Sequence, residues 1–220
     1  MNSRLFAIGD IHGCFDAFKN LIEHKIKLNR NDKLILLGDF IDRGKQSKEV
    51  VDYIIDLLRK DFDIVPLMGN HEAMLLDVLE DKEYLSNWIL NGGHETLHSF
   101  GIHSLKDLDQ HYSAFFKSLI LYYSFDNFLF VHAGFNNASE DPFSDKHQML
   151  WSRYKVYTHP LLKDKIIIHG HTPITETQCQ QLVTARKQTI NIDTGCVYSH
   201  EVGFGRLTAL ELYSYNLFSV

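Results

Sequence analysis

Residues 5–44 read LFAIGDIHGCFDAFKNLIEHKIKLNRNDKLILLGDFIDRG, and this stretch decides the fold. It contains two fully apolar runs, residues 5–8 and 34–37, each followed directly by Gly-Asp. Short apolar runs that end in such a loop are typical of buried parallel strands. Between them, apolar side chains recur at helical spacing over about residues 14–27, which predicts an amphipathic helix. The stretch therefore predicts a strand, a helix and a second strand.

The same alternation continues downstream. A helix is predicted over about residues 47–60, with Ser47 as its N-terminal cap. A third strand is predicted over residues 63–68, where Pro66 indicates a bulge or a position at the sheet edge. Alternating strands and helices are the signature of a right-handed parallel α/β layer.

The second half of the chain has a different pattern. Residues 72–118 are predicted to be mainly helical, with Asn91-Gly92-Gly93 as the clearest break. Strand-like runs follow at residues 119–124, 128–132, 166–169, 182–185, 188–193 and 206–212. Few predicted helices separate these runs, so we expect antiparallel strands and hairpins beside the parallel core. The predicted fold class is α/β, a layered sandwich with mixed sheets in one domain over residues 1–220, with a helical insert at about 72–118.

Composition excludes several classes of protein. The 220 residues carry 22 Lys+Arg against 28 Asp+Glu, a formal charge of −6, which argues against a nucleic-acid binder held by general electrostatics. The three cysteines form neither a disulfide framework nor a zinc knuckle, so we expect a reduced, cytoplasmic protein. No signal peptide and no apolar run of ~18 residues is visible, which argues against membrane contact. Nothing in the sequence indicates an oligomeric state.

Metal-capable side chains follow the predicted strands. The clusters are Asp10-Ile11-His12-Gly13, Asp39-Phe40-Ile41-Asp42-Arg43-Gly44, Asn70-His71-Glu72, Val131-His132-Ala133-Gly134 and His169-Gly170-His171-Thr172. In open α/β sheets the carboxyl ends of strands converge on the ligand site. One Gly-Asp after a strand is more often a turn, but five such clusters in order favour a metal centre. The candidate ligands are Asp10, His12, Asp39, Asn70, His132 and His171, a mixed N/O set that suits Mn, Fe or Zn.

These motifs, together with Gly170-His171-Thr172-Pro173, resemble those of the calcineurin-like metallophosphoesterases, and more narrowly the serine/threonine phosphoprotein phosphatase branch. That branch includes small bacterial and bacteriophage phosphatases and the diadenosine tetraphosphatases. The motifs run from residue 9 to residue 173, about three quarters of the chain. The resemblance implies an α/β/β/α sandwich and a metal-dependent phosphoester hydrolase.

The resemblance also implies two divalent metal ions, with Mn favoured and Fe or Zn as alternatives. Asp10 and His12 would hold the first ion, Asp39 would bridge both, and the second would be completed by Asn70, His132 and His171. A shared carboxylate tolerates two cations about 3.5 to 4 Å apart, and a bridging water loses a proton near neutral pH. The resulting hydroxide would be the nucleophile.

Four further residues receive roles from the same resemblance. Asp42 and His71 correspond to an Asp-His pair in which the imidazole protonates the leaving oxygen. Arg43 and Arg153 correspond to arginines that bind phosphate oxygens through their planar fork, beside Asn70. For Arg153, within Leu150-Trp151-Ser152-Arg153, a surface ion pair is an equally good interpretation.

The sequence departs from the wider superfamily at one position. Many phosphodiesterase branches have GHxH, where the last histidine adds a ligand to the first metal, but Pro173 stands there and cannot ligate. This departure favours phosphomonoesterases and tetraphosphatases. The motif also favours His171 over His169 as the ligand.

Two substrate classes remain open. An acidic rim over Asp77, Glu80, Asp81 and Glu83, beside Trp88, Asn91-Gly92-Gly93 and His94, would favour peptides with basic flanks, although such a run is usually a solvated helix face. The leading hypothesis is a serine/threonine phosphoprotein phosphatase acting on phosphoproteins or phosphopeptides. The runner-up is a symmetrical bis(5'-nucleosyl)-tetraphosphatase that cleaves a dinucleoside polyphosphate, diadenosine tetraphosphate, to ADP. A catalytically silent metal-binding scaffold is a remote third hypothesis, because no motif is eroded.

Overall fold

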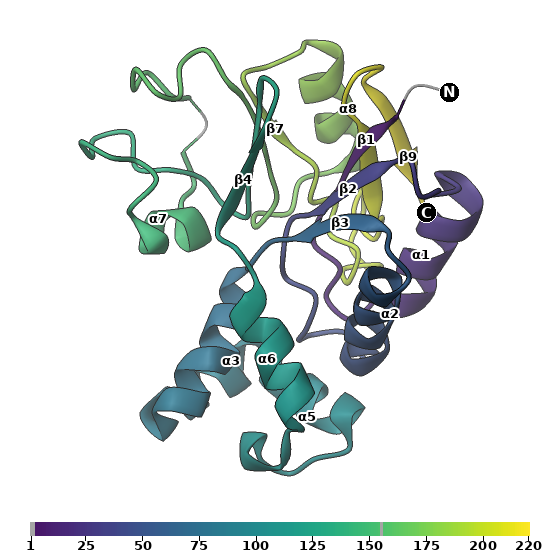
Figure 1. Ribbon diagram of the computed structural model, residues 1–220, viewed down its shortest axis with the longest axis vertical. Coiled ribbons are helices and arrows are strands. Elements are labelled where there is room, and N and C mark those ends of the chain that lie inside the picture. Colours follow the sequence, from purple (N-terminus) through teal and green to yellow (C-terminus); the bar gives the residue numbers. More distant parts are fainter. Residues whose placement is uncertain (1–2, 155) are drawn as a thin grey trace.

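The structure is a computed structural model that describes residues 3–154 and 156–220. Its two mixed β-sheets pack against each other, with helices on the outer sides and a helical segment at one end (Figure 1). The apolar layer between the sheets takes side chains from both, among them Leu5, Ala7, Ile35, Phe130, Ile168 and Ile190. The predicted layered sandwich with mixed sheets is confirmed.

The first sheet has five strands. Their order is β3 (Asp63–Pro66), β2 (Lys33–Leu36), β1 (Leu5–Ile8), β8 (Thr208–Glu211) and β9 (Asn216–Ser219). Strands β1, β2 and β3 are parallel, as predicted, whereas β8 and β9 add an antiparallel hairpin. Pro66 lies in the outermost strand, where its missing N–H breaks no ladder within the sheet.

The second sheet has the order β4 (Tyr122–Phe125), β5 (Phe128–Val131), β6 (Ile166–His169) and β7 (Thr189–Asn191). Only β4 and β5 form a hairpin, and β5, β6 and β7 are parallel. The expectation of antiparallel strands and hairpins in this half was therefore only partly correct. The parallel connections contain the helices α7 (Lys146–Trp151) and α8 (Glu176–Thr184), which the sequence pattern did not reveal.

The strand predicted at residues 182–185 was wrong, because residues up to Thr184 belong to α8. Thr175 caps this helix by accepting the backbone N–H of Gln178, and Cys179 and Val183 are buried one turn apart. A short apolar run cannot by itself distinguish a buried strand from a buried helix turn. The N-terminal cap and the i, i+4 spacing decide in favour of the helix.

The helices on the first sheet match their predicted positions. α1 (Phe15–Asn20), continued by a π-helical turn at Leu21–Lys25, and α2 (Ser47–Arg59) pack on the face away from the second sheet. The prediction of Ser47 as a cap was wrong, because the N-cap is Gln46. The Ser47 hydroxyl instead accepts the backbone N–H of Asp42 at 3.1 Å.

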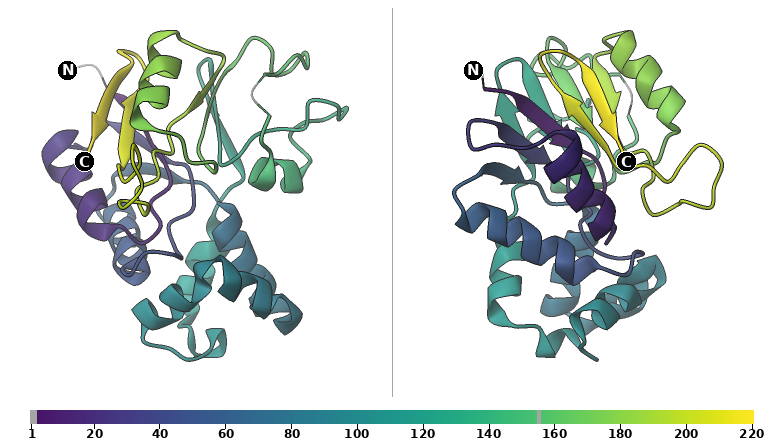
Figure 2. Two further views of the ribbon diagram at one scale, coloured as in Figure 1. Left: turned by 180° about the vertical axis from the view of Figure 1, so that it is seen from behind. Right: turned by 90° about the vertical axis from the view of Figure 1, so that its right-hand side faces the viewer.

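The helical segment lies at one end of the sandwich, where the turned views show it below both sheets (Figure 2). It comprises α3 (Asn70–Glu80), α4 (Leu85–Trp88), α5 (His94–Phe100) and α6 (Gln110–Ser118), joined by short 3-10 and π turns. The chain breaks at Gly92, as predicted, with φ 103°. Within the described ranges, no helix has the length and apolarity needed to cross a bilayer.

Candidate metal centre

The predicted ligand residues come together between the two sheets. Asp10 follows β1, Asp39 follows β2, and Asn70 begins α3 after β3, while His132 and His171 follow β5 and β6. All but the half-buried His171 are buried. The carboxyl ends of five strands thus meet at one edge, as the topology rule requires.

Asp39 lies at the centre of this group. Its Oδ2 is 3.5 Å from Nε2 of His12 and 3.4 Å from Nε2 of His132, so one oxygen stands between imidazoles from different sheets. Its Oδ1 accepts the backbone N–H of His71 at 3.1 Å. Burial alone would raise the pKa of Asp39, but the surrounding imidazoles outweigh it and hold the pKa well below its usual range.

On one side of Asp39, three further donors lie close together. His132 Nε2 is 2.9 Å from Asn70 Oδ1 and 3.2 Å from His171 Nδ1, and that nitrogen is 2.9 Å from the same amide oxygen. His132 Nδ1 donates to the carbonyl of Leu37 at 2.9 Å, which leaves the lone pair of Nε2 facing the cluster.

On the other side, His12 is oriented in the same way. Its Nδ1 donates to the carbonyl of Ile41 at 2.9 Å, and its Nε2 faces Nη1 of Arg43 at 2.6 Å. The carboxylate of Asp10 is turned toward the backbone N–H of His171, at 3.0 Å. The tight group of possible ligand atoms on this side consists of His12, Asp39 and His71, and the predicted ligand Asp10 is not part of it.

The chemistry of these donors fits divalent cations. Two groups, each within 4.8 Å, share Asp39: His12, Asp39 and His71, and Asp39, His132 and His171. Burial lowers the pKa of His12 and His132, and lowers that of His171 to about 3, so these imidazoles are neutral at physiological pH. Imidazoles, an amide oxygen and carboxylates that face one another are the ligand types that bind divalent cations in proteins.

The Asp42–His71 pair is buried next to Asp39. His71 Nδ1 donates to Asp42 Oδ2 at 2.7 Å, and Nε2 of His71 is buried with no hydrogen-bond partner. Asp42 also accepts from Trp88 Nε1 at 2.9 Å and from Thr96 Oγ1 at 2.6 Å. Burial lowers the pKa of His71, but the carboxylates of Asp39 and Asp42 outweigh it and raise the pKa.

Glu72 organises the backbone beneath the site, a role that the sequence did not reveal. Its buried carboxylate accepts four backbone N–H groups, those of Asp39, Phe40, Ile41 and Gly69. Because Glu72 is the third residue of α3, it also caps that helix. A glutamate three residues after a strand-ending glycine was the available signal.

The two arginines differ in their surroundings. Arg43 is half-buried and its backbone N–H bonds to the carbonyl of Gly92 at 3.3 Å. A Cβ at Gly92 would lie 2.7 Å from Arg43 N, so only glycine fits against this loop. Arg153 is exposed, and its Nη1 donates to Thr172 Oγ1 at 3.3 Å, one residue from His171.

The acidic rim does not surround the metal centre. Glu80, Asp81 and Glu83 are exposed, and Asp77 to Glu80 lie about 10 to 15 Å along α3 from Asn70 at 1.5 Å per residue. Trp88 is fully buried beneath Asp42 rather than placed on a rim. The acidic run is therefore a solvated helix end.

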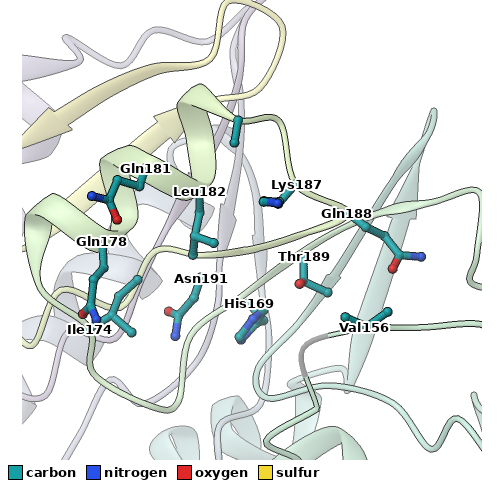
Figure 3. A pocket seen from close by; sticks show the side chains of 11 residues that line it. Val156, His169, Ile174, Gln178, Gln181, Leu182, Lys187, Gln188, Thr189 and Asn191 are labelled. Atoms are coloured by element: carbon teal, nitrogen blue, oxygen red, sulfur yellow. The ribbon is translucent and has the colours of Figure 1, made fainter.

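A cavity of about 610 Å³ lies between α8 and β7 (Figure 3). His169 lines this cavity, whereas His171 belongs to the group of possible metal ligands. The cavity also reaches Asn191, whose side-chain amide donates to the carbonyl of Thr172 at 2.8 Å. Its walls combine apolar side chains such as Ile174 and Leu182 with several side-chain amides.

Comparison with known proteins assigns the fold. A family model described as calcineurin-like phosphoesterase matches residues 3–203. Over its whole length the chain is similar to the structure of a protein serine/threonine phosphatase from Saccharomyces cerevisiae, with a TM-score of 0.65 and 17% identity, covering 79% of that chain. At this identity the likeness concerns the fold alone.

Two curated relatives match along most of their length. The chain is 28% identical over 225 residues to serine/threonine-protein phosphatase 2 of Salmonella typhimurium, covering 92% of both chains. It is 28% identical over 230 residues to the asymmetrical bis(5'-nucleosyl)-tetraphosphatase PrpE of Anoxybacillus flavithermus, covering 92% of this chain and 88% of that one.

Other relatives match over a shorter stretch. A zinc-dependent endopolyphosphatase of Saccharomyces cerevisiae is 38% identical over 90 residues, which is 40% of this chain and 26% of the relative. A symmetrical bis(5'-nucleosyl)-tetraphosphatase of Pseudomonas syringae is 37% identical over 81 residues, which is 37% of this chain. The chain spans about a quarter of the length of these two relatives.

Proposed function

Because the chain belongs to the calcineurin-like phosphoesterase family, we propose that it is a metal-dependent phosphatase that hydrolyses phosphoserine and phosphothreonine in proteins or peptides. The observation that carries this proposal is the buried, unpartnered Nε2 of His71, held by Asp42 beside Asp39. A serine or threonine alkoxide is a poor leaving group and needs a proton, whereas cleavage of a phosphoanhydride releases a phosphate group as a stable anion. A positioned acid therefore favours a phosphomonoester.

Two bound divalent cations would supply Lewis acidity and a water molecule of lowered pKa. For the first ion we propose Asp10, His12 and Asp39 as ligands, and for the second Asp39, Asn70, His132 and His171. Asp10 belongs to this set because it is buried close enough to Asp39 for the two charges to interact. The mixed N/O donors support manganese, with iron or zinc as alternatives.

The protein side of the reaction depends on hydrogen bonds already present. Asp42 fixes the orientation of the His71 ring through Nδ1, so that Nε2 can deliver a proton to the departing oxygen. Trp88 and Thr96 hold Asp42 in turn, and prevent its carboxylate from rotating away from the imidazole. We assign Arg43, Arg153 and the amide of Asn70 to the binding of phosphate oxygens.

Hydrolysis of bis(5'-nucleosyl) tetraphosphates is the second candidate. The cavity beside Thr172 favours it, because a substrate with a nucleoside at each end needs a pocket beyond its phosphates. Apolar walls combined with side-chain amides suit a nucleobase. The similarity to PrpE along most of the chain supports the same alternative.

We also propose that the protein works in the cytoplasm, without nucleic-acid or membrane partners. The three cysteines in the described residues are free thiols, which suits a reducing compartment. The formal charge of −6 opposes binding to a nucleic acid or to an anionic membrane surface.

A direct competition between substrates tests the proposal. The manganese-loaded protein is assayed with p-nitrophenyl phosphate, a phosphothreonine peptide and diadenosine tetraphosphate, and the products are separated by chromatography. We expect release of inorganic phosphate from the first two, with a higher kcat/KM for the peptide than for the dinucleotide. A much higher kcat/KM for the dinucleotide, with ADP as the product of symmetrical cleavage or ATP and AMP as the products of asymmetrical cleavage, would reverse the order of the candidates. Loss of every activity in Asp39→Asn assigns the turnover to this site rather than to a contaminant.

A further inference from the structure

Asp193 is a buried carboxylate with no assigned role. It lies just beyond the end of β7, the strand after β6, and is 2% exposed. Its Oδ1 accepts the backbone N–H of Gly195 at 2.9 Å, but its Oδ2 is buried and has no hydrogen-bond partner. Burying a charged oxygen without a partner is costly, so a compensating group is needed.

The location of the other unpartnered atoms indicates where that group binds. In the part of the chain that the structure describes, the buried side-chain polar atoms without a partner are Nε2 of His71, Nε2 of His171 and Oδ2 of Asp193. The two imidazole nitrogens belong to residues of the metal centre. We therefore expect all three atoms to face the candidate metal centre. Asp193 is the only one of these three residues that the sequence motifs did not indicate.

Asp193 is next to Asp10. A Cβ added at Gly170 would overlap Asp10 Oδ1 and lie 3.6 Å from Cβ of Asp193, so the two side chains meet over this glycine. The contact brings the end of β1, from the first sheet, against the end of β7, from the second. Two buried carboxylates side by side repel each other unless a cation or a shared proton lies between them.

The numbers of proposed ligands at the two cation sites also indicate that Asp193 acts at the first site. The second ion has four proposed protein ligands, whereas the first has three, Asp10, His12 and Asp39. Two residues after His171 the chain has Pro173, whose side chain offers no ligand atom. An additional carboxylate beside Asp10 therefore lies on the side of the centre that has fewer protein ligands.

We propose that Asp193 is a further residue of the first cation site, where its carboxylate acts with Asp10 to bind and position that ion. This inference rests on the proposed two-cation site. Asp193 is a positioning residue, since nothing places it against the substrate. Its effect is therefore expected on metal affinity first, and on turnover only through the bound ion.

Calorimetric titration with Mn²⁺ tests the proposal, using wild type, Asp193→Asn and the control Glu201→Gln. Asparagine keeps the Oδ1 acceptor for Gly195 and the shape of the side chain, but removes the negative charge. Glu201 lies in the same loop and is exposed. We expect about 10- to 100-fold weaker binding of one ion in Asp193→Asn, as for other partners of metal ligands, and unchanged binding in the control.

Two backgrounds identify which ion is affected. In His12→Ala, which removes a first-site ligand, Asp193→Asn should cause no further loss of affinity. In His132→Ala, which removes a second-site ligand, it should still weaken the ion that remains. The reverse pattern, or equal Mn²⁺ affinities of Asp193→Asn and wild type, overturns the assignment.

Thermal unfolding with and without Mn²⁺ separates this role from a structural one. Removing one of two adjacent buried carboxylates should leave the metal-free Tm unchanged or higher, while the rise in Tm on adding Mn²⁺ becomes smaller. An equal fall in Tm in both conditions identifies Asp193 as merely structural and contradicts the inference. A wild-type protein that binds no Mn²⁺ contradicts the two-cation proposal itself, whereas a wild type with two ions and an unaffected variant contradicts only the role of Asp193.

Discussion

The two sheets contribute unequal halves of the metal centre. The first sheet and the helical segment supply the half around Asp39, Asp42 and His71, whose side chains are buried, and there Asp42 accepts hydrogen bonds from His71, Trp88 and Thr96. The second sheet supplies His132 and His171, with Arg153 beside them. In that half Arg153 is exposed and has one side-chain hydrogen bond of 3.3 Å, and His171 is only half-buried.

The difference suggests which half is organised before ions and substrate arrive. A side chain whose partners are all protein groups keeps its geometry in the free protein, and such preorganisation is the source of catalytic efficiency. A side chain that lacks partners gains them only from its ligand. We therefore expect substitutions in the first half to lower kcat, and those in the second half to act mainly on KM or metal affinity.

Asp39→Asn should have the largest effect, because Asp39 joins the two halves. Its Oδ2 lies between His12 and His132, so loss of the charge weakens both cation sites together. We expect Mn²⁺ affinity to fall by more than the ~10- to 100-fold typical of an indirect partner, and turnover to fall to the metal-free rate. Asp32→Asn is the matched control, since Asp32 is also buried but pairs with Arg4. Retention of two tightly bound ions by Asp39→Asn would refute its bridging role.

His71→Asn should come next, and should separate proton transfer from metal binding. We expect kcat for a phosphothreonine peptide to fall by about 10²- to 10⁴-fold, the range for loss of a general acid. The bound metal, measured by elemental analysis, should stay at the wild-type ratio. His111→Asn removes a histidine from a comparable pair with Asp109 on the surface, and should leave kcat unchanged. Loss of metal from His71→Asn would instead make His71 a ligand.

Arg43→Lys and Arg153→Lys compare the halves directly. Lysine keeps the charge but loses the planar fork that binds two phosphate oxygens. For the half-buried Arg43 we expect kcat/KM to fall about 10- to 100-fold, because a hydrogen bond to a charged group contributes ~1.5 to 3 kcal/mol. For the exposed Arg153 we expect kcat/KM to fall by less than about 10-fold, mostly through a higher KM. Equal losses in steady-state assays would show that the halves are equally organised.

The sequence predicted the parts of the site that follow from strand order. Asp10, Asp39, Asn70, His132 and His171 each follow a strand, and the carboxyl ends of parallel strands meet wherever such a sheet forms. The first sheet and its helices were predicted for the same reason, since strands and helices there alternate regularly. Local patterns were sufficient because each of these features lies within a short stretch of chain.

The parts that were missed depend on contacts between distant residues. Trp88 and Thr96 bond to Asp42 across 46 and 54 positions, and no spacing rule connects them. Asp193 reaches Asp10 only because the two sheets pack together. The helix at residues 176–184 was interpreted in part as a strand, because Leu182-Val183 is too short for its period to be recognised.

Asp42→Asn should have a moderate effect that depends on pH. The carboxylate stabilises the protonated imidazole of His71 and so raises its pKa. His71 then stays protonated, and able to donate, to a higher pH. Without the charge the pKa falls, so the alkaline limb of the kcat profile should move to lower pH. A profile that keeps its wild-type limb would show that His71 is not the group titrating.

The smallest effect is expected for Trp88→Phe, compared with Trp151→Phe in the other half. Trp88 is fully buried and donates Nε1–H to Asp42, whereas Trp151 is 36% exposed and lies edge-on to His171 with ring centroids 5.9 Å apart. Phenylalanine at position 88 leaves Asp42 bonded to His71 and Thr96. The Asp42–His71 pair therefore keeps its hydrogen bond, but the carboxylate is held less firmly. We expect a fall of a few-fold in kcat, and a free energy of unfolding lower by about 1.5 to 3 kcal/mol, the contribution of a hydrogen bond to a charged group.

For Trp151→Phe the free energy of unfolding should change by less than about 0.5 kcal/mol, as for most surface substitutions. Chemical denaturation of both metal-free variants measures this contrast without any influence from bound ions. If Trp151→Phe destabilised the protein as much as Trp88→Phe, the second half would be as tightly packed as the first. The greater order of the first half would then have to arise from the bound ions and not from the protein.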